Sequence, residues 1–106
     1  MGQIPMMNTL TGFQRDLLTI VAGLDEPHGL AVKEEADEYY DSEINHGRLY
    51  PNLDTLVQNG LVEKTAKDRR TNCYSLTEKG VEAIQDRREW EEERTSDITS
   101  QTRVRL

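Results

Sequence analysis

The sequence contains a single cysteine, Cys73, so no disulfide can form within the chain. No stretch approaches the roughly 18 apolar residues that a membrane-spanning helix requires. The first residues, 1–8, place no basic side chain ahead of an apolar run, as a secretory signal would. We therefore expect a cytoplasmic protein that makes no membrane contact.

Catalytic and metal-binding patterns are also absent from the sequence. It has no glycine-rich phosphate loop and no nucleophile elbow, and its carboxylates lie in polar helical runs instead of apolar surroundings. The spacing of His28, His46 and Cys73 matches no recognised set of metal ligands. We expect no enzyme activity, no catalytic residue, no metal and no cofactor, and no small-molecule ligand is evident.

Basic residues are scarce. The 106-residue chain carries 13 lysines and arginines against 20 acidic residues, a net charge of −7 that would repel a polyanion. Residues 44–75 depart from this balance with five basic and three acidic side chains, so they carry +2 and the remainder carries −9. An acidic body with one mildly basic edge is compatible with a nucleic-acid site on that edge. Because only four of the basic residues are lysine, the composition also suggests, as a hypothesis, a salt-loaded, halophilic cytoplasm.

Residues 45–60 have apolar side chains at helical spacing, which predicts a helix anchored by one face. The anchoring residues are Leu49, Leu53, Leu56, Val57 and Leu61. Polar side chains on the other face suit base edges or phosphates, and they belong to Arg48, Asn52, Thr55 and Asn59. Asn45 is the natural N-cap, and the N–H groups at a helix start favour phosphate.

A β-hairpin is predicted directly after Gly60. Two short runs rich in branched and aromatic residues, 61–65 and 73–76, flank a polar tip that carries Arg69 and Arg70. A helix followed by a basic hairpin indicates a winged helix-turn-helix, in which the helix enters a DNA groove and the hairpin contacts the flanking backbone.

Two further helices are expected before residue 45. The first spans about 11–24 with Thr11 as its N-cap, and the second spans about 30–40, after a break at 25–29. We expect the charged side chains of the second helix to be mostly solvated; these are Lys33, Glu34, Glu35, Asp37 and Glu38. The fold class is thus α+β and mainly helical, a winged helix-turn-helix with a C-terminal dimerisation helix.

The last helix, capped by Thr77, is expected to reach about Arg94. Its apolar face is thin and its charges suit an exposed surface, so it would be marginal alone. A chain of this length also has a small core that a second copy would enlarge. We predict a homodimer with the sole tryptophan as its anchor. Its contacts would be Phe13, Leu17, Val81, Ile84, Arg88 and Trp90.

The chain is divided accordingly into four parts. Residues 1–10 form an apolar N-terminal arm that is expected to pack, with a second subunit as one candidate surface. Residues 11–76 form the winged helix-turn-helix DNA-binding domain. Residues 77–94 form the dimerisation helix, and residues 95–106 form a polar tail.

The candidate DNA contacts come from the helix start, its polar face and the hairpin: Asn45, His46, Gly47, Arg48, Asn52, Thr55, Lys64, Lys67, Arg69, Arg70 and Thr71. Several have a plainer interpretation. Arg48 could be a surface arginine, and Arg69 and Arg70 could form a solvated turn, although their positions favour DNA. His46 could contact DNA or merely cap the helix, whereas His28 is interpreted as structural, at a helix entry.

Cys73 is the one candidate redox residue, because a lone thiol can be oxidised reversibly. Reactivity requires exposure and an electropositive setting. An ordinary strand residue is the favoured interpretation.

A set of motifs occurs in a fixed order along residues 11–90: His28-Gly29, Leu49-Tyr50-Pro51 with Leu53 and Leu56, Gly60-Leu61-Val62, Arg69-Arg70, Tyr74 and Leu76-Thr77-Glu78-Lys79-Gly80. Together they resemble the PadR-type winged-helix regulators. The resemblance implies a homodimeric transcriptional regulator that binds double-stranded DNA, with its two recognition helices in successive major grooves of a pseudo-palindromic site. With its acidic surface, the chain is similar in particular to haloarchaeal oxidative-stress regulators of this type, which implies control by reactive oxygen.

Only about 30 residues follow Leu76, so the large C-terminal helical domain of many PadR relatives, and ligand sensing through it, are not expected. The alternative class is a winged-helix module that binds protein and has no specific affinity for DNA. In that case the polar face of the third helix would be dispensable for duplex binding.

Overall fold

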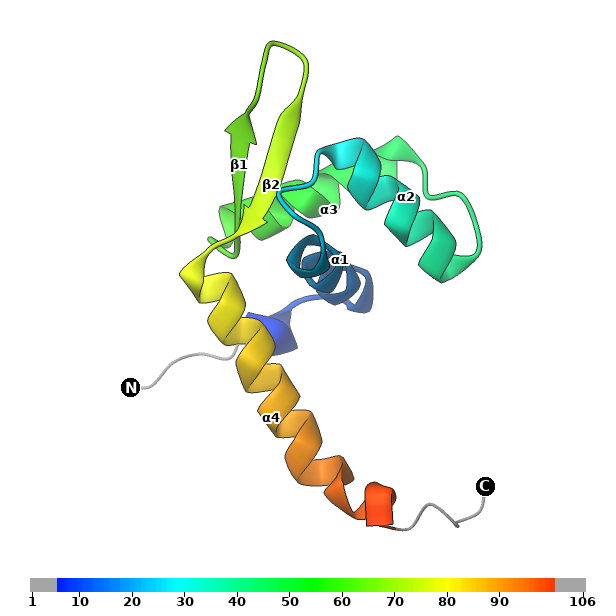
Figure 1. Cartoon of the computed structure of the whole chain (residues 1–106), viewed down its shortest axis with the longest axis vertical. Coiled ribbons are helices and arrows are strands. Elements are labelled where there is room, and N and C mark those ends of the chain that lie inside the picture. Colours follow the sequence, from blue (N-terminus) through cyan, green and yellow to red (C-terminus); the bar gives the residue numbers. More distant parts are fainter. Residues whose placement is uncertain (1–5, 101–106) are drawn as a thin grey trace.

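Seven elements of secondary structure follow one another along residues 6–100, the part of the chain that the computed structural model describes (Figure 1). They are η1 (Met6–Thr9), α1 (Gly12–Gly23), α2 (Gly29–Tyr40), α3 (His46–Gln58), β1 (Val62–Ala66), β2 (Asn72–Leu76) and α4 (Glu78–Ser100). The two strands pair antiparallel, with Val62 opposite Leu76. The mainly helical α+β class and the order of a winged helix-turn-helix are confirmed.

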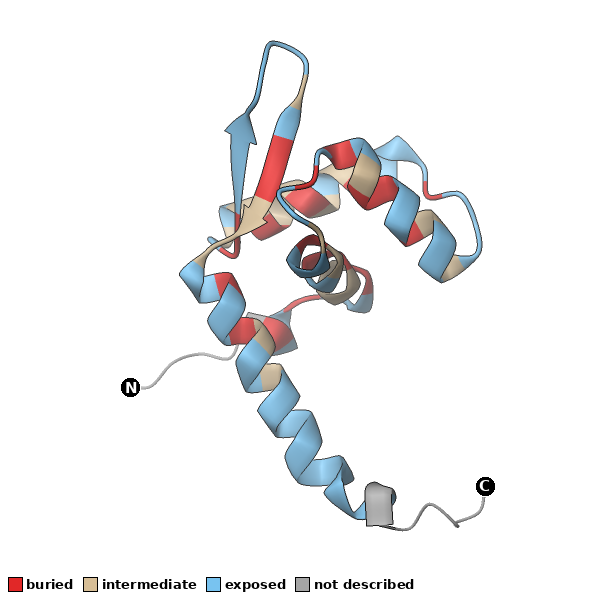
Figure 2. Ribbon diagram, viewed as in Figure 1, coloured by how far each residue is buried: buried red, intermediate tan, exposed pale blue. Residues whose placement is uncertain are grey.

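The core lies where α1, α3 and the base of the hairpin meet (Figure 2). At the start of α1, the hydroxyl of Thr11 accepts from the N–H of Gln14, and the side-chain oxygen of Gln14 accepts from the N–H of Thr11. This capping box explains why the helix begins there. The fully buried leucines of this core are Leu17, Leu18, Leu49, Leu53, Leu56 and Leu61. Both the predicted Thr11 cap and the predicted anchoring face of α3 are confirmed.

Two side chains that were predicted to contact a second subunit are covered within their own chain. Leu17 is fully buried and Phe13 is nearly so, and their part in a dimer contact stays a prediction. Met7 and Leu10, from the N-terminal arm, are also buried in this core. The arm from residue 6 onward therefore packs against α4 of the same chain, and the earlier residues lie outside the described part.

The turn between α2 and α3 is fixed by polar contacts. Asp41 adopts a left-handed conformation, with φ at 55°, and ends α2. Oδ1 of Asp37 accepts from the backbone N–H of Ile44 at 2.7 Å, and its Oδ2 accepts from Nζ of Lys33 at 2.8 Å. The same Nζ lies 3.5 Å from a carboxylate oxygen of Glu43. Lys33 is only 7% exposed, so the expectation of a solvated lysine is wrong; two carboxylates balance its charge.

The base of the hairpin and the start of α4 are joined by Thr77 and Gly80. The hydroxyl of Thr77 donates to the carbonyl of Gly60 at 2.6 Å and accepts from the N–H of Gly80 at 3.0 Å. Thr77 thus caps α4, as predicted, and holds it to the hairpin. A Cβ at Gly80 would lie 2.2 Å from the carbonyl oxygen of Leu61, so this close approach requires glycine.

The last helix is longer than expected. It continues to Ser100 and does not end near Arg94, so the first part of the predicted polar tail is helical. Ala83 and Ile84 pack its first turns onto the core. Nearly all later side chains are exposed, and the helix projects away from the body (Figure 2).

Candidate nucleic-acid interface

The first turn of α3 is exposed, as predicted. Oδ1 of Asn45 accepts a hydrogen bond from the N–H of Arg48 at 2.9 Å, which confirms Asn45 as the N-cap. His46, Gly47 and Arg48 are all exposed, and His46 packs edge-on against Tyr50. N–H groups at a helix start and the positive end of the helix dipole favour a phosphate at this place.

The guanidinium group of Arg48 stacks on aromatic rings of its own chain. Its central carbon lies 3.9 Å from the centroid of the Phe13 ring and 5.9 Å from that of Tyr40. The Tyr40 hydroxyl in turn donates to Asp16, and burial together with this bond raises the pKa of Tyr40 to about 12. Arg48 is therefore exposed to solvent, and the orientation of its guanidinium group is set by its contacts with Phe13 of α1 and Tyr40 of α2.

The polar face of α3 is turned partly inward. Oδ1 of Asn52 accepts from Nε2 of Gln14 at 2.8 Å, and its Nδ2 donates to the carbonyl of Arg48 at 2.7 Å. The hydroxyl of Thr55 donates to the carbonyl of Pro51 at 3.1 Å. Both side chains are half-buried; that of Asn52 connects α3 to α1, and that of Thr55 is bonded within α3. The contact with Gln14 was missed from the sequence, because no local pattern links residues so far apart along the chain.

The hairpin tip presents basic side chains to solvent. Oδ1 of Asp68 accepts from the N–H groups of Arg70 and Thr71 at 2.8 and 2.9 Å. These backbone bonds, that of Arg70 first, lower the pKa of Asp68. The turn is thereby shaped by one carboxylate, while the side chains of Lys67, Arg69 and Arg70 are exposed and that of Thr71 is half-buried.

A cleft of about 570 Å³ lies between the hairpin, α3 and the start of α2. Asp54 of α3 and Lys64 of β1 both line it, with 3.3 Å between Oδ1 and Nζ. The predicted DNA contact Lys64 is thus paired with a carboxylate that sequence reasoning had not singled out. Tyr50 and Arg70 line the same cleft, so α3 and the hairpin tip border one surface.

The segment before α2 pairs with the hairpin. The N–H of Tyr74 donates to the carbonyl of Pro27 at 2.8 Å, and His28 forms an isolated bridge with Cys73. Nδ1 of His28 accepts from the N–H of Ala31 at 3.2 Å, so His28 caps α2, in agreement with the structural role predicted for it. Cys73 is 8% exposed, which limits the access of an oxidant to its thiol.

The predicted dimer contacts separate into two groups. Those of α1 are buried in the core. Those of α4 are accessible: Val81, Arg88 and Trp90 are exposed, and Ile84 is half-buried.

Two further properties concern the described part of the chain alone. Within residues 6–100, no group of three or more His, Cys, Asp or Glu side chains is placed to hold a metal ion. None of the helices in that range is both long and apolar enough to cross a membrane.

Comparison with known proteins identifies the family of the chain. The profile of the transcriptional regulator PadR-like family matches residues 17–86. The chain belongs to the PadR-like family. RosR in the complex hsRosR-S1 is 48% identical to this PadR-like chain, with 91% of this chain and 86% of that chain covered and a TM-score of 0.82. The chain in a second structure, that of H. salinarum RosR grown from NaBr, is 53% identical. The comparison covers 80% of this chain and 76% of that chain, with a TM-score of 0.76.

A more distant structure extends the comparison of folds. MarR is 19% identical, with 92% of the PadR-like chain and 72% of that chain covered and a TM-score of 0.63, so the two share the fold alone. No curated protein sequence matches the chain. The predicted PadR-like identity is confirmed, and the protein is a DNA-binding regulator of transcription, in a family of regulators and not of enzymes.

Proposed function

We propose that this PadR-like chain acts in the cytoplasm as a homodimer that binds one specific pseudo-palindromic site in double-stranded DNA. The observation that carries the proposal is the exposure of two elements, the first turn of α3 and the arginine tip of the hairpin, together with the cleft that Tyr50 of α3 and Arg70 of the hairpin both line. In such a dimer each α3 enters a major groove, and the two half-sites are centred about 34–36 Å apart. Residues 11–76 then supply the DNA contacts and α4 supplies the dimer contacts.

The side chains divide into readers and positioning groups. Arg48 is our first candidate for a base contact, since an exposed arginine in the first turn of a recognition helix can bind guanine through two hydrogen bonds. His46 and the N–H of Gly47 lie beside it, where they suit a base edge or a phosphate. Half-buried Asn52 ties α3 to α1 through Gln14, and half-buried Thr55 is bonded within α3, so we assign both an indirect part in recognition.

The hairpin supplies contacts that do not depend on base sequence. Arg69, Arg70 and Lys67 are exposed at its tip, where they suit phosphates or the minor groove. Lys64 can join them only if it leaves Asp54, and Thr71 lies deeper in the turn.

Two variants test this assignment on an operator that is first obtained by binding-site selection at the working salt concentration. Arg48→Ala should cost about 1–3 kcal/mol in binding free energy and relax the preference at one base position. Arg69→Ala/Arg70→Ala should weaken binding to all sequences alike and flatten the dependence of affinity on salt. Lys79→Ala, which removes an exposed positive charge at the start of α4, is the control and should change neither property.

The alternative function makes the opposite prediction. If neither the Arg48 variant nor the hairpin variant alters duplex affinity, the proposal that these residues bind a specific DNA site fails. The alternative, a domain that binds a protein partner, is then favoured. Fluorescence anisotropy on the selected site and on a scrambled duplex distinguishes the two outcomes.

The proposed physiological setting is the oxidative-stress response of a halophilic archaeon. The similarity to RosR and the acidic, lysine-poor composition support it. A melting temperature that rises with KCl would agree with this setting, and a flat or falling one would contradict it. The variant Cys73→Ser, assayed for the effect of peroxide on DNA binding, tests whether this thiol is the sensor. A response equal to that of the wild type excludes Cys73 as the sensor.

A further inference from the structure

Arg48, our first candidate for a base contact, lies over two aromatic rings of other helices. Its guanidinium carbon is 3.9 Å from the centroid of the Phe13 ring and 5.9 Å from that of the Tyr40 ring. The two ring centroids are 5.7 Å apart, and the ring planes are tilted by 49°. Phe13 belongs to the start of α1 and Tyr40 to the end of α2, so this ring pair, Phe13 and Tyr40, brings three helices together at one arginine.

The ring pair is itself held in place. Phe13 is 8% exposed and is part of the core. Tyr40 packs against the core, its hydroxyl donates to a carboxylate oxygen of Asp16, and Tyr39 meets its ring edge-on. Burial, together with the bond to Asp16, raises the pKa of Tyr40 to about 12, so the hydroxyl keeps its proton far above neutral pH. The two rings therefore form a fixed surface for the guanidinium group.

The backbone of Arg48 is held as well. Its N–H donates to Oδ1 of Asn45 at 2.9 Å, and its carbonyl accepts from Nδ2 of Asn52 at 2.7 Å. Within residues 6–100, its guanidinium group forms neither a hydrogen bond nor an ion pair. The side chain is thus held by one face, while the N–H groups along its edge stay available.

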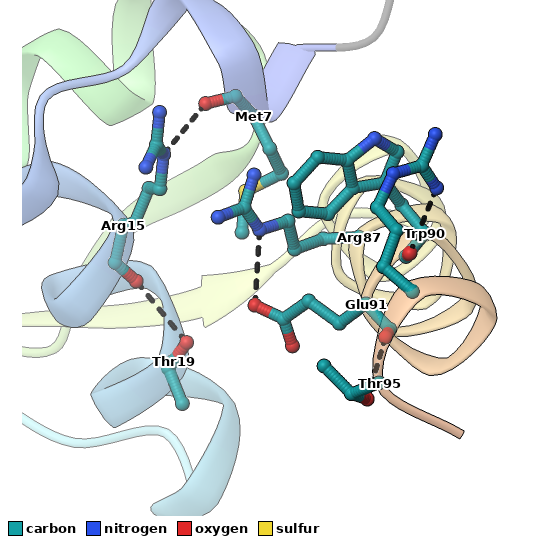
Figure 3. Close-up of polar contacts among 8 residues, drawn as sticks. Met7, Arg15, Thr19, Arg87, Trp90, Glu91 and Thr95 are labelled. Carbon is teal, nitrogen blue, oxygen red and sulfur yellow. Dashed lines mark hydrogen bonds and ion pairs between the residues drawn. The ribbon is translucent and has the colours of Figure 1, made fainter. Parts of the chain in front are cut away.

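Two arginines of α4 are also stacked on a ring, but they differ in this respect. Figure 3 shows Arg87 beside the indole of Trp90, where its guanidinium carbon lies 4.5 Å from the ring centroid and its Nε donates to Glu91 at 3.1 Å. The guanidinium carbon of Arg94 lies 4.6 Å from the same centroid, and one of its terminal nitrogens donates to the carbonyl of Trp90 at 3.0 Å. Both use their N–H groups within their own helix, whereas those of Arg48 are left for another molecule.

Stacking by the face and hydrogen bonding by the edge are compatible in one guanidinium group, because it is planar and its N–H groups lie in its plane. Two of these groups can bind O6 and N7 of guanine together. A side chain that is already held loses less freedom on binding than one that is free in solvent. We propose that Phe13 and Tyr40 are positioning residues for base recognition, which hold Arg48 so that its edge is presented to a base before DNA binds. The inference rests on the proposed function, in which Arg48 contacts a base, and adds to it two residues of α1 and α2.

The test measures base discrimination, which is the ratio of the dissociation constants for a duplex with one base pair changed and for the selected operator. The changed position is the one at which Arg48→Ala relaxes the preference. Phe13→Leu keeps an apolar side chain but removes the ring, and it should lower the discrimination at that position about two- to fivefold, as expected for an exposed cation–π contact. Tyr40→Leu should lower it less, because that ring lies farther from the guanidinium group. Leu17→Val, which reduces the core on the same helix and leaves both rings, is the control for lost stability and should not lower it.

A double variant separates positioning from a purely structural role. In the Arg48→Ala background, Phe13→Leu should cause no further loss of discrimination, because the arginine that the ring positions is gone. A loss that persists in this background would overturn the inference, since the ring would then act on α3 as a whole. Fluorescence anisotropy gives the dissociation constants, and circular dichroism selects a temperature at which every variant is folded.

Failure of the inference is distinguishable from failure of the proposed function. Wild-type discrimination in both Phe13→Leu and Tyr40→Leu, while Arg48→Ala relaxes the preference, would overturn the inference and leave Arg48 as a base contact. An Arg48→Ala variant that discriminates like the wild type at every position would overturn both. If Phe13→Leu does not fold, Tyr40→Leu, at a half-buried side chain, decides alone.

Discussion

The helix after the turn, α3, and the C-terminal helix, α4, are held in different ways. α3 has 13 residues, and its leucine stripe is buried in its own chain while Asn45 caps its start and Gln14 contacts its side. α4 has 23 residues, yet only its first turns pack on the core. Packing within one chain therefore orders α3, the helix that we propose reads DNA, whereas the outer half of α4 packs on nothing in its own chain.

This difference follows from where the apolar side chains lie. A helix in a small domain gains most of its stability from the apolar face that it buries. α3 buries Leu49, Leu53 and Leu56 on one side. α4 exposes Trp90 and Ile98, so these residues gain little from folding within one chain.

The largest effect should come from truncating the buried face of α3. Leu53→Ala should lower the free energy of unfolding by about 2–5 kcal/mol, because it leaves a cavity in the core. Ile98→Ala, at a side chain that is 63% exposed, should change it by less than about 0.5 kcal/mol. Urea unfolding of dilute protein measures both, and a similar cost at the two positions would contradict the contrast between the helices.

The junction between the two regions should be nearly as sensitive. Gly80→Ala should cost about 1–3 kcal/mol, because the new Cβ would meet the Leu61 carbonyl oxygen at 2.2 Å. Gly23→Ala is the matched control: nothing lies within 4 Å of a Cβ there, so stability should stay level or rise. Equal effects of the two substitutions on the unfolding midpoint would show that α4 is free to shift away from the hairpin.

Much of this arrangement could be predicted from the sequence, because its signals are local. The leucine spacing of α3, the caps Thr11 and Asn45, and the two runs of the hairpin each depend on neighbours within a few residues. The same holds for the exposed arginines at the hairpin tip, which follow from a short polar turn.

The errors concern contacts between distant segments. Periodicity places Leu17 on the apolar face of its helix, but it does not show whether that face is covered by its own chain or by a second copy. Lys33 pairs with Asp37 on its own helix, and the turn after α2 then brings Glu43 to the same Nζ and helps to bury it. The face of Asn52 was correctly placed as polar, but its partner Gln14 comes from another helix.

A smaller effect should separate reading from positioning on α3. Asn52→Ala should cost about 1 kcal/mol of stability, and Gln14→Ala somewhat more because it also removes the capping bond to Thr11. The double variant should cost less than the sum, because both changes remove the bond between Gln14 and Asn52. DNA affinity should fall by similar factors in the two single variants. A loss of base preference in Asn52→Ala that Gln14→Ala does not share would instead make Asn52 a reader.

The last effect is a change in how stability depends on pH, and it concerns the turn between α2 and α3. The N–H of Ile44 and the ammonium group of Lys33 lower the pKa of Asp37 below 3.8. The hydrogen bond to Asp37, with the charge of Glu43 nearby, raises the pKa of Lys33 above 10.5. The contribution of Asp37 to stability is thus complete above pH 3.8 and is lost as the pH falls below it, whereas that of Lys33 is complete below pH 10.5 and is lost as the pH rises further.

Asp37→Asn should therefore flatten the acid side of the stability profile and leave its shape near neutral pH unchanged. The amide can still accept from the N–H of Ile44, but it no longer balances the buried Lys33, so the whole profile should also be lower. Glu34→Gln, at an exposed acid of the same helix, is the control. Urea midpoints from neutral pH to below 3.8 provide the measurement. If both variants keep the wild-type slope, the stability of the turn does not depend on the Asp37 carboxylate.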